Sequence, residues 1–296
     1  MPAFTSITII YNPNSTGSSQ KLAAATRRKL QAALEGQHIG MIGTEYAGHA
    51  EELAYELAHA SKHPLVITAS GDGGYNEIVN GLQRAQHEGA RPTAGLLPAG
   101  NANDHYHCLH HGDFAQAVVR GDSRTIDLLK LEVAKTGGQH LTRYAHSYIG
   151  LGLTSRIGRE LNKTQLSLIK EVWLVGKTFL KSGRVHIKVR GQMHTYRSLI
   201  FSNINRMAKI LALTKDSTVD DGKFEVSALY HKSKFGFALL LLKAAAPGLH
   251  STTQATRYTF STTRRTVAQL DGEIQPLEDD AKVTVTICPK ALKCIV

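Results

Sequence analysis

The chain has 296 residues, which is enough for one large domain or two of ordinary size. Its composition, 42% hydrophobic and 20% charged, is typical of a soluble globular protein, and no apolar run approaches the roughly 20 residues of a membrane-spanning helix. The net charge of +11 favours anionic partners such as nucleotides, a membrane surface or nucleic acid. Because no zinc-finger or RNP signature accompanies the charge, we expect no nucleic-acid partner. The three cysteines form no spaced framework and the first residues carry no secretory signal, which together indicate a reduced, cytoplasmic protein.

Strand, polar loop and helix alternate in the first part of the chain, up to about residue 120. Expected strands cover residues 6–11, 38–46, 65–69 and 93–98, and expected helices cover residues 20–34, 48–61 and 75–87, with a further helix opening at residues 103–104. Repeated units of this kind predict an open α/β domain with a mostly parallel sheet. Ligands of such sheets bind beyond the carboxyl ends of the strands, so we expect the polar loops to converge there.

A glycine-rich stretch, residues 70–74 (Ser-Gly-Asp-Gly-Gly), follows the apolar strand at residues 65–69 and precedes a helix. The backbone N–H groups of such a loop, with the positive end of the following helix, favour bound phosphate. Asp72 would repel phosphates unless a divalent cation bridges them, so the stretch indicates a metal–nucleotide site. A structural turn fits the spacing as well, because short glycine-rich loops are weak motifs.

The pattern changes after Gly121, and we expect one domain at residues 1–124 and a second at residues 125–296, whose C-terminal tail can pack back on the first. Expected strands at residues 126–133, 141–149, 185–189, 196–203, 224–229, 257–261 and 283–287 predict a mainly antiparallel second domain. Two helices are expected within it, at residues 165–181 and 234–246. The second helix is almost wholly apolar, which favours a place in the core; a face towards a membrane or a second subunit is the alternative.

Two acidic stretches stand out in the second half. Residues 220–223 (Asp-Asp-Gly-Lys) lie before an expected strand, and residues 270–273 (Leu-Asp-Gly-Glu) follow a short apolar run. Each is also typical of a type I turn or a hairpin loop with an acidic surface. Their interest comes from the phosphate loop of the first domain. Phosphoryl transfer needs positioning and charge neutralisation, and a carboxylate across a cleft between the domains could accept the proton of an acceptor hydroxyl.

Five short motifs follow one another along the chain. They are Asn12–Pro13 with Gly17, Ser70–Gly71–Asp72–Gly73 followed by Asn76–Glu77, residues 97–104 (Leu-Pro-Ala-Gly-Asn-Ala-Asn-Asp), Asp220–Asp221–Gly222 and Asp271–Gly272–Glu273. Over essentially its whole length the chain resembles the catalytic-domain family of diacylglycerol and related lipid kinases, which includes bacterial lipid kinases and sphingosine kinases. The resemblance implies an N-terminal three-layer α/β nucleotide-binding domain, similar to that of NAD kinases, followed by a mainly antiparallel β-sandwich domain. This agrees with the pattern of expected elements.

The resemblance also implies roles for single residues. Asp72 would act through Mg²⁺ on the ATP phosphates, and Asp104 would be the next acid of the catalytic network. Glu273 would be the proton acceptor, and Asp271 beside it is predicted as a further catalytic residue. The implied nucleotide-binding residues are Asn12, Pro13, Asn14, Ser15, Gly17, Thr44, Ser70, Gly71, Asp72, Gly73, Gly74, Asn76, Asn101 and Asn103. The implied ligands of a structural magnesium ion are Asp221 and the carbonyls of Thr218 and Lys223.

The chain departs from the family pattern at three places. The glycine-rich loop of the family usually begins Gly-Gly and ends in Thr, whereas Ser70 and Gly74 stand there, so one hydroxyl that could touch a phosphate is missing. Asn101 replaces another usual threonine, and residues 206–211 replace a segment that is usually glycine-rich. These departures bear on substrate and rate rather than on the fold.

The residues and the resemblance together predict an ATP- and Mg²⁺-dependent kinase that phosphorylates a hydroxyl of diacylglycerol or a related lipid alcohol. We expect it to touch an anionic membrane surface transiently, as a cytoplasmic protein peripheral at the inner face of the membrane. Two alternatives stay open: a kinase of a small soluble alcohol such as NAD, and a nucleotide- or lipid-binding member of the family that no longer catalyses. The sequence also leaves a homodimer open.

Overall fold

The structure is a computed structural model that describes residues 3–15, 18–109, 112–134, 140–152, 184–204, 206–207, 211–212, 218–229 and 252–296. Gly17 and the helices expected at residues 165–181 and 234–246 lie outside the described residues. The chain forms two compact units, Met1–Ile126 with Lys290–Val296, and Asp127–Pro289. The expected domain limits, residues 1–124 and 125–296, stay a prediction.

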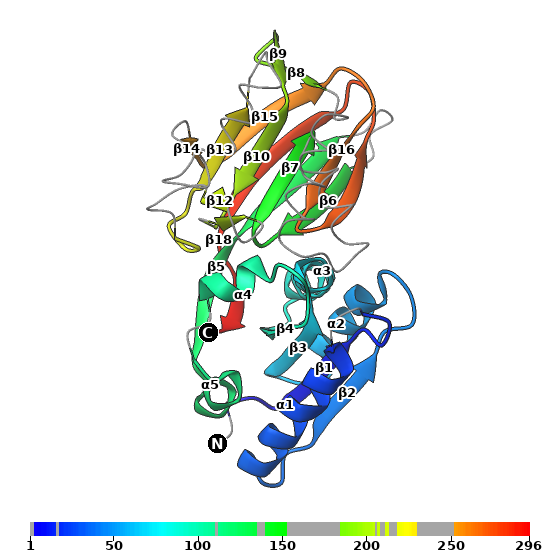
Figure 1. The fold of residues 1–296 in the computed structure, drawn as a ribbon, viewed down its shortest axis with the longest axis vertical. Helices are drawn as coiled ribbons and strands as arrows, with labels where there is room; N and C mark the ends of the chain where they lie inside the picture. The colour runs from blue at the N-terminus through cyan, green and yellow to red at the C-terminus, as the bar shows by residue number, and fades with distance from the viewer. Residues whose placement is uncertain are drawn as a thin grey trace. The chain divides into compact units, whose positions relative to one another are not determined.

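The first unit is built on a parallel sheet (Figure 1). Its strands are β1 (Ser6–Tyr11), β2 (Ile39–Gly43), β3 (Pro64–Ser70), β4 (Thr93–Pro98) and the end of β18 (Lys282–Ile295). They lie in the order β2-β1-β3-β4-β18, and each is parallel to its neighbours. Every residue of β3 is buried, because a central parallel strand is covered on both faces and its side chains are mostly apolar. The predicted parallel sheet is confirmed.

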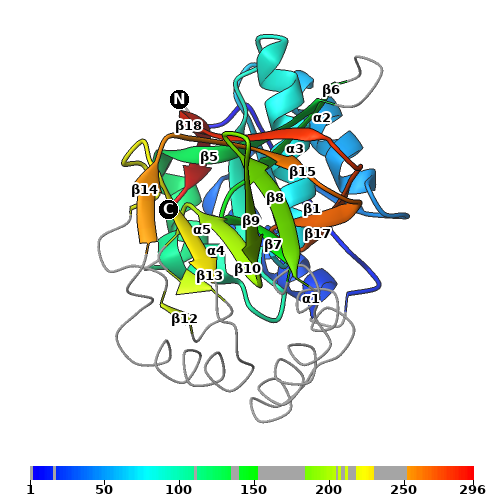
Figure 2. The same cartoon turned by 90° about the horizontal axis from the view of Figure 1, so that it is seen from above.

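Helices cover both faces of this sheet. They are α1 (Ser19–Ala33), α2 (His49–His59), α3 (Asp72–His87), α4 (Asp104–Leu109) and α5 (Phe114–Arg120). The pair α1 and α5 packs together, as does the pair α2 and α3, and Figures 1 and 2 show the two pairs on opposite sides of the sheet. Ile9, Leu30, Ile67 and Phe114 belong to the core on the α1 side. This is the three-layer arrangement that the resemblance implied. None of the described helices combines the length and the apolar composition needed to cross a membrane.

The glycine-rich stretch is mostly helical, which corrects the expected loop. The helix α3 begins at Asp72 instead of residue 75, and the extended residue Gly71 precedes it as the N-cap. Asp72, Gly73 and Gly74 therefore form the first helical turn, where a negative side chain is favoured by the helix dipole. The backbone N–H groups that the sequence offered for phosphate binding are those of a helix N-terminus.

The second unit contains two antiparallel sheets that pack together and a separate pair of short strands, β11 and β12. Its strands are β5 (Ser123–Ala134), β6 (His140–Ala145), β7 (Tyr148–Gly152), β8 (Val185–Val189), β9 (Gln192–Tyr196), β10 (Ser198–Ser202), β11 (Arg206–Met207), β12 (Leu211–Ala212), β13 (Phe224–Leu229), β14 (Thr252–Ala255), β15 (Arg257–Thr262), β16 (Thr266–Leu270), β17 (Glu273–Leu277) and the first part of β18. One sheet has the order β14-β13-β10-β7-β16-β17; in the other, β15 pairs with β8 and β18, and β5 pairs with β6. Leu131, Phe201 and Val285 belong to the core that the sheets share, so the predicted β-sandwich is confirmed.

Several strand predictions need correction. The strand expected at residues 141–149 is two strands, β6 and β7, and the one expected at residues 196–203 covers the end of β9 and all of β10. The strand expected at residues 283–287 is part of the 14-residue β18. The strands β16 and β17 were not predicted, although a hairpin loop was one interpretation of residues 270–273, where their turn lies. The pattern identified most strand segments but not all of their ends.

Candidate active site

The loop after β1 is held by its own polar groups. The side-chain oxygen of Asn12 accepts a hydrogen bond from the backbone N–H of Asn14 (2.9 Å), and the carbonyl of Asn12 accepts from the N–H of Ser15 (3.2 Å). The hydroxyl of Ser19 accepts from the N–H of Asn12 (3.2 Å) and donates to the carbonyl of Ala69 in β3. These bonds keep three predicted nucleotide-binding residues at the carboxyl ends of β1 and β3.

The loops after β3 and β4 meet through two glycines. A Cβ atom on Gly100 would lie 2.3 Å from the Cα of Gly71, and one on Gly71 would lie 3.0 Å from the Cα of Gly100. Neither position can carry a side chain without a shift of backbone, so glycine is required for this close approach. The second and third predicted motifs are therefore packed directly against each other.

Asp72 joins these loops by hydrogen bonds. Its Oδ2 accepts from the backbone N–H of Asp104 (3.3 Å) and its Oδ1 accepts from the N–H of His105 (3.3 Å). One carboxylate thus lies in the first turn of α3 and also against the start of α4. Asp104 is buried, with 3% of its surface exposed. The structure brings together the two acids that were predicted to act in one network.

The predicted asparagines of the site have structural partners. Asn103 has a φ of 51°, and its side chain accepts from the N–H of Gly100 and donates to the carbonyl of Gly100, both at 2.9 Å. The side chain of Asn76 is buried and its oxygen accepts from the amide of Asn80 (3.1 Å). Asn101 is exposed. Asn103 and Asn76 therefore shape the loop and the helix around the site.

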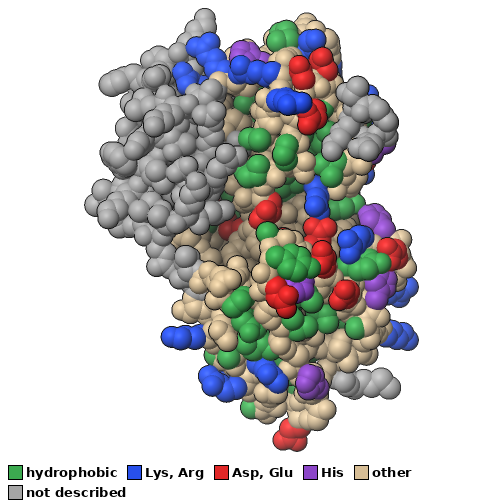
Figure 3. Space-filling model, turned by 90° about the vertical axis from the view of Figure 1, so that its right-hand side faces the viewer, with side chains coloured by type: hydrophobic (Ala, Val, Ile, Leu, Met, Phe, Trp, Pro, Cys, Tyr) green, Lys and Arg blue, Asp and Glu red, His purple; other side chains and the backbone are tan. Residues whose placement is uncertain are grey.

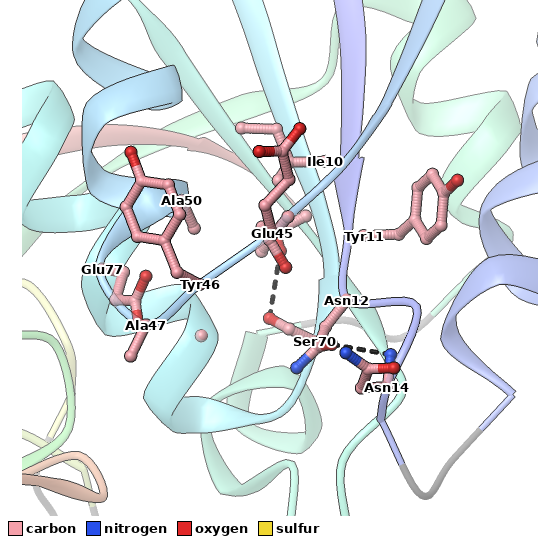
Figure 4. A pocket seen from close by; sticks show the side chains of 13 residues that line it. Ile10, Tyr11, Asn12, Asn14, Glu45, Tyr46, Ala47, Ala50, Ser70 and Glu77 are labelled. Carbon is pink, nitrogen blue, oxygen red and sulfur yellow. Dashed lines mark hydrogen bonds between the residues drawn. The ribbon is translucent and has the colours of Figure 1, made fainter.

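A pocket of about 280 Å³ opens at the carboxyl ends of β1 and β3 (Figure 4). It is lined by Ile10, Tyr11, Asn12, Asn14, Thr44, Glu45, Tyr46, Ala47, Ala50, Thr68, Ser70, Gly74 and Glu77. Figure 4 shows Tyr46 and Glu77 on one side, Asn12 and Asn14 on the other, and Ser70 between them. Of the predicted nucleotide-binding residues, the pocket brings together Asn12, Asn14, Thr44, Ser70 and Gly74. The other described ones, Pro13, Ser15, Gly71, Asp72, Gly73, Asn76, Asn101 and Asn103, do not line it.

Glu77 is a pocket residue to which we assigned no role. Backbone N–H groups of Gly48, Ala50 and Glu51, at the start of α2, hydrogen-bond to its carboxylate. Burial nevertheless raises the pKa of Glu77 above its ordinary value, and the opposing effect of these N–H groups is smaller. The sequence could have indicated that Glu77 lies near the site, because it directly follows Asn76 in the second motif.

In the second unit, Asp271 is fully buried at the β16–β17 turn, and both oxygens of its carboxylate accept hydrogen bonds. Its Oδ2 accepts from the N–H of His146 (2.7 Å), and its Oδ1 accepts from the N–H groups of Ser147 (3.0 Å) and Tyr148 (2.8 Å). The imidazole Nε2 of His146 lies 3.3 Å from the same Oδ2. Glu273, two residues on, begins β17 and is exposed. Asp271 therefore fixes the turn that presents Glu273, and the sequence did not indicate His146 as its partner.

The predicted metal ligands share a turn before β13. Thr218, Asp221 and Lys223 are exposed there, and the carboxylate of Asp221 accepts from the N–H of Lys223 (2.9 Å). The buried carboxylate of Asp127 accepts from the N–H of Gly222 (2.7 Å) and holds this turn. Asp127 went unnoticed, although an acid between the apolar residues Ile126 and Leu128 is a usable indication.

Mg²⁺ prefers oxygen ligands and usually takes one or two carboxylates with carbonyls and water, which this turn can supply. Among the described residues, no group of three or more His, Cys, Asp or Glu side chains is arranged to hold a metal ion.

Comparisons with known proteins give a family model and several relatives that are similar to this chain. The family model described as the diacylglycerol kinase catalytic domain matches residues 6–131. A diacylglycerol kinase of Bacillus subtilis is 29% identical over 288 residues, which cover 90% of this chain and 88% of the relative. One from Staphylococcus aureus is 26% identical over 254 residues, covering 82% of this chain and 76% of the relative.

Two solved structures are similar in fold alone. A diacylglycerol kinase from Bacillus anthracis has a TM-score of 0.69 at 19% identity, with 99% of this chain and 97% of that chain covered. Yeast NADH kinase complexed with NADH has a TM-score of 0.57 at 10% identity, with 98% and 83% covered.

The three-layer unit with its pocket, the antiparallel unit and the curated relatives define the chain as a kinase. As its motifs predicted, residues 6–131 match the diacylglycerol kinase catalytic domain, and most of the chain is similar to relatives named diacylglycerol kinase.

Proposed function

We propose that the chain transfers the γ-phosphate of ATP to a hydroxyl of diacylglycerol or a related lipid alcohol. The observation that carries this proposal is the pocket of about 280 Å³ at the carboxyl ends of β1 and β3, lined by residues of the predicted nucleotide motifs. Ligands of parallel α/β sheets bind at this edge. The relatives named diacylglycerol kinase support a lipid acceptor.

The ATP phosphates would bind at the first turn of α3. The first N–H groups of a helix have no carbonyl partner within the helix, and the helix dipole adds positive potential there. Each carboxylate oxygen of Asp72 accepts an N–H group. Asp72 would also hold a magnesium ion, because carboxylate oxygens are preferred ligands of Mg²⁺. A bound Mg²⁺ would neutralise phosphate charge during transfer. Asp104, which lies against Asp72, would complete the acidic side of the site.

Glu273 would accept the proton of the attacking hydroxyl. It is exposed, as a group that meets a substrate must be, and the carboxylate of Asp271 is buried and already bonded. We therefore assign Glu273 the role of general base and Asp271 the role of a positioning residue. This replaces the catalytic role that the resemblance implied for Asp271.

The turn at residues 218–223 would hold a structural magnesium ion. Asp221 would supply a carboxylate, and Thr218 and Lys223 would supply carbonyls, as the resemblance implied. The buried Asp127 supports this proposal because it fixes the turn through the N–H of Gly222. The ion would order the start of β13 and take no part in the reaction.

We further propose that the protein works in the cytoplasm at the inner membrane surface. A lipid alcohol is presented at such a surface, and the net charge of +11 supports attraction to anionic lipid. On the face in Figure 3, the described Lys and Arg side chains lie scattered among acidic ones, which fits transient contact better than tight docking. A homodimer stays an untested expectation.

The experiment is a transfer assay with ATP, Mg²⁺ and diacylglycerol in detergent micelles. We expect phosphatidic acid as the product, and a loss of rate of about a hundredfold or more in the Asp72→Ala variant, since Asp72 would hold the charge-neutralising ion. Thermal melting of both proteins controls for misfolding. Absence of transfer above the level of Asp72→Ala would refute the proposal.

A further inference from the structure

Ser70 and Gly74 face each other across the junction of β3 and α3. Ser70 is the last residue of the strand, and Gly74 lies in the first turn of the helix. A Cβ atom on Gly74 would lie 2.7 Å from the Cβ of Ser70 and 2.9 Å from its hydroxyl oxygen. Both distances are shorter than real side-chain contacts, so a side chain at position 74 requires Ser70 to move.

Ser70 has little freedom to move. Only 9% of its surface is exposed. Its hydroxyl accepts a hydrogen bond from the hydroxyl of Thr68 (3.0 Å) and donates one to the carbonyl of Gly71 (3.1 Å). Turning the Ser70 side chain away would break both bonds in a buried place, which is costly. A serine at position 70 and a side chain at position 74 therefore exclude each other.

Because of this exclusion, the two departures from the family pattern, Ser70 and Gly74, depend on each other. The sequence suggested that a hydroxyl was lost where Gly74 replaces threonine. The structure places a hydroxyl on the opposite wall of the same space, because Ser70, Thr68 and Gly74 all line the pocket. Figure 4 shows Ser70 at the centre of the pocket, between Asn14 and Glu77.

We propose that the Ser70 hydroxyl is a phosphate contact of the nucleotide pocket, and that position 74 is glycine because Ser70 fills its side-chain space. The contact needs only a rotation of the hydroxyl hydrogen from the carbonyl of Gly71 towards a phosphate oxygen, with the Thr68 bond kept. The identity of the ligand rests on the proposed function. The exclusion between the two positions rests on the packing alone.

The test is a double-mutant cycle with Ser70→Gly, Gly74→Thr and the variant that carries both changes. Two quantities are measured: the Kd of Mg-ATP by calorimetry, and the melting temperature without ligand. Gly74→Thr alone should lower the melting temperature and weaken ATP binding about tenfold or more, because its side chain collides with Ser70. In the doubly substituted protein, the Kd of Mg-ATP should return to within about threefold of the value of the unsubstituted protein. Its melting temperature should return to within a few degrees.

A second pair of variants distinguishes the phosphate contact of the Ser70 hydroxyl from the steric clash between positions 70 and 74. Ser70→Ala keeps the Cβ atom and removes the hydroxyl, so it should weaken ATP binding by about two- to tenfold, the net value of one hydrogen bond. Ser70→Ala combined with Gly74→Thr should stay impaired, because the clash with the Cβ atom remains. Additive effects in the melting cycle would overturn the exclusion. Unchanged ATP affinity in Ser70→Ala, or no ATP binding by the unsubstituted protein, would overturn the contact.

These outcomes are distinct from failure of the proposed function. A protein that binds ATP and shows a non-additive cycle, but phosphorylates no lipid, would refute the lipid kinase proposal and keep this inference.

Discussion

Asp271 and Glu273 lie two residues apart in the chain but differ in burial and in hydrogen bonding. Three backbone N–H groups bond to the carboxylate of the buried Asp271, whereas Glu273 is exposed at the start of β17. The motif places both acids at one turn. The difference between them depends on His146, which is 125 residues away in the chain. Sequence spacing could locate the turn but not this division of roles.

The two acids predict opposite outcomes for matched amide substitutions. Asp271→Asn replaces one acceptor oxygen by a donor in a fully buried place, so we expect a loss of about 1–3 kcal/mol in the free energy of unfolding. Glu273→Gln should leave that free energy within about 0.5 kcal/mol and reduce kcat by about a hundredfold or more. Urea unfolding and the transfer assay measure the two effects. Equal loss of stability in both variants would contradict the assignment.

At the scale of single residues, the motifs predicted part of the pocket and missed the rest. Asn12, Thr44 and Ser70 were expected and line it. Glu45 and Tyr46 also line it, but they follow β2 without any motif that singles them out. Pocket residues that belong to a recognised motif were predictable, and those that line the pocket only through their place in the fold were not.

At the scale of elements, α2 and α3 are tied through Glu77. Its carboxylate accepts N–H groups at the start of α2, yet burial raises its pKa. A raised pKa means that the folded state binds the proton more tightly than the unfolded state. The stability that Glu77 contributes is therefore fully present below its ordinary pKa of 4.5 and is lost as the pH rises through the raised value.

Glu77→Gln removes this titration and is the matched control. We expect the melting temperature of the unsubstituted protein, relative to that of Glu77→Gln, to fall as the pH rises from the ordinary pKa of 4.5 through the raised value. Calorimetric scans of both proteins across this range measure the difference. A difference that stays constant, or rises, would show that the pKa of Glu77 is not raised in the folded state.

The strand β18 closes the sheet of the first unit, where Cys294 lies beside Ala94 of β4. Burial raises the pKa of Cys294 to about 12, and its thiol lies 3.6 Å from the carbonyl of Arg124. At pH 8 only about one thiol in ten thousand would be ionised. We expect Cys294 to resist alkylation by iodoacetamide in the folded protein and to react in denaturant.

Cys108 and Cys288 are partly exposed and serve as internal references, read by mass spectrometry of peptides. Labelling of Cys294 at the same rate as these two would show that β18 does not pack in the first unit as described.

Periodicity predicted elements best where the fold is most regular. The parallel sheet was predictable from the apolar run in β3 and from the alternation of strands and helices. Both signals are local, because each βα unit is continuous in the sequence. The break between β6 and β7 falls at His146 and Ser147, with neither glycine nor proline to mark it. The length of β18 depends on partners in both units, β15 and β4, which no local pattern contains.

At the scale of the whole molecule, the fold is shared by kinases of different acceptors. The Bacillus anthracis diacylglycerol kinase and yeast NADH kinase are both similar to this chain in fold. Fold alone therefore does not decide between a lipid and a soluble acceptor. The motif at residues 271–273 and the named relatives favour the lipid, and the acceptor itself must be measured.

The most direct measurement is a competition for the phosphate in one reaction. The protein is incubated with Mg²⁺, ATP labelled at the γ-phosphate, diacylglycerol in micelles and NAD, and the label is followed into the organic and aqueous phases. We predict that label enters the organic phase as phosphorylated lipid and that Glu273→Gln slows this transfer by about a hundredfold or more. Label found on NAD, or in no acceptor at all, would contradict the account.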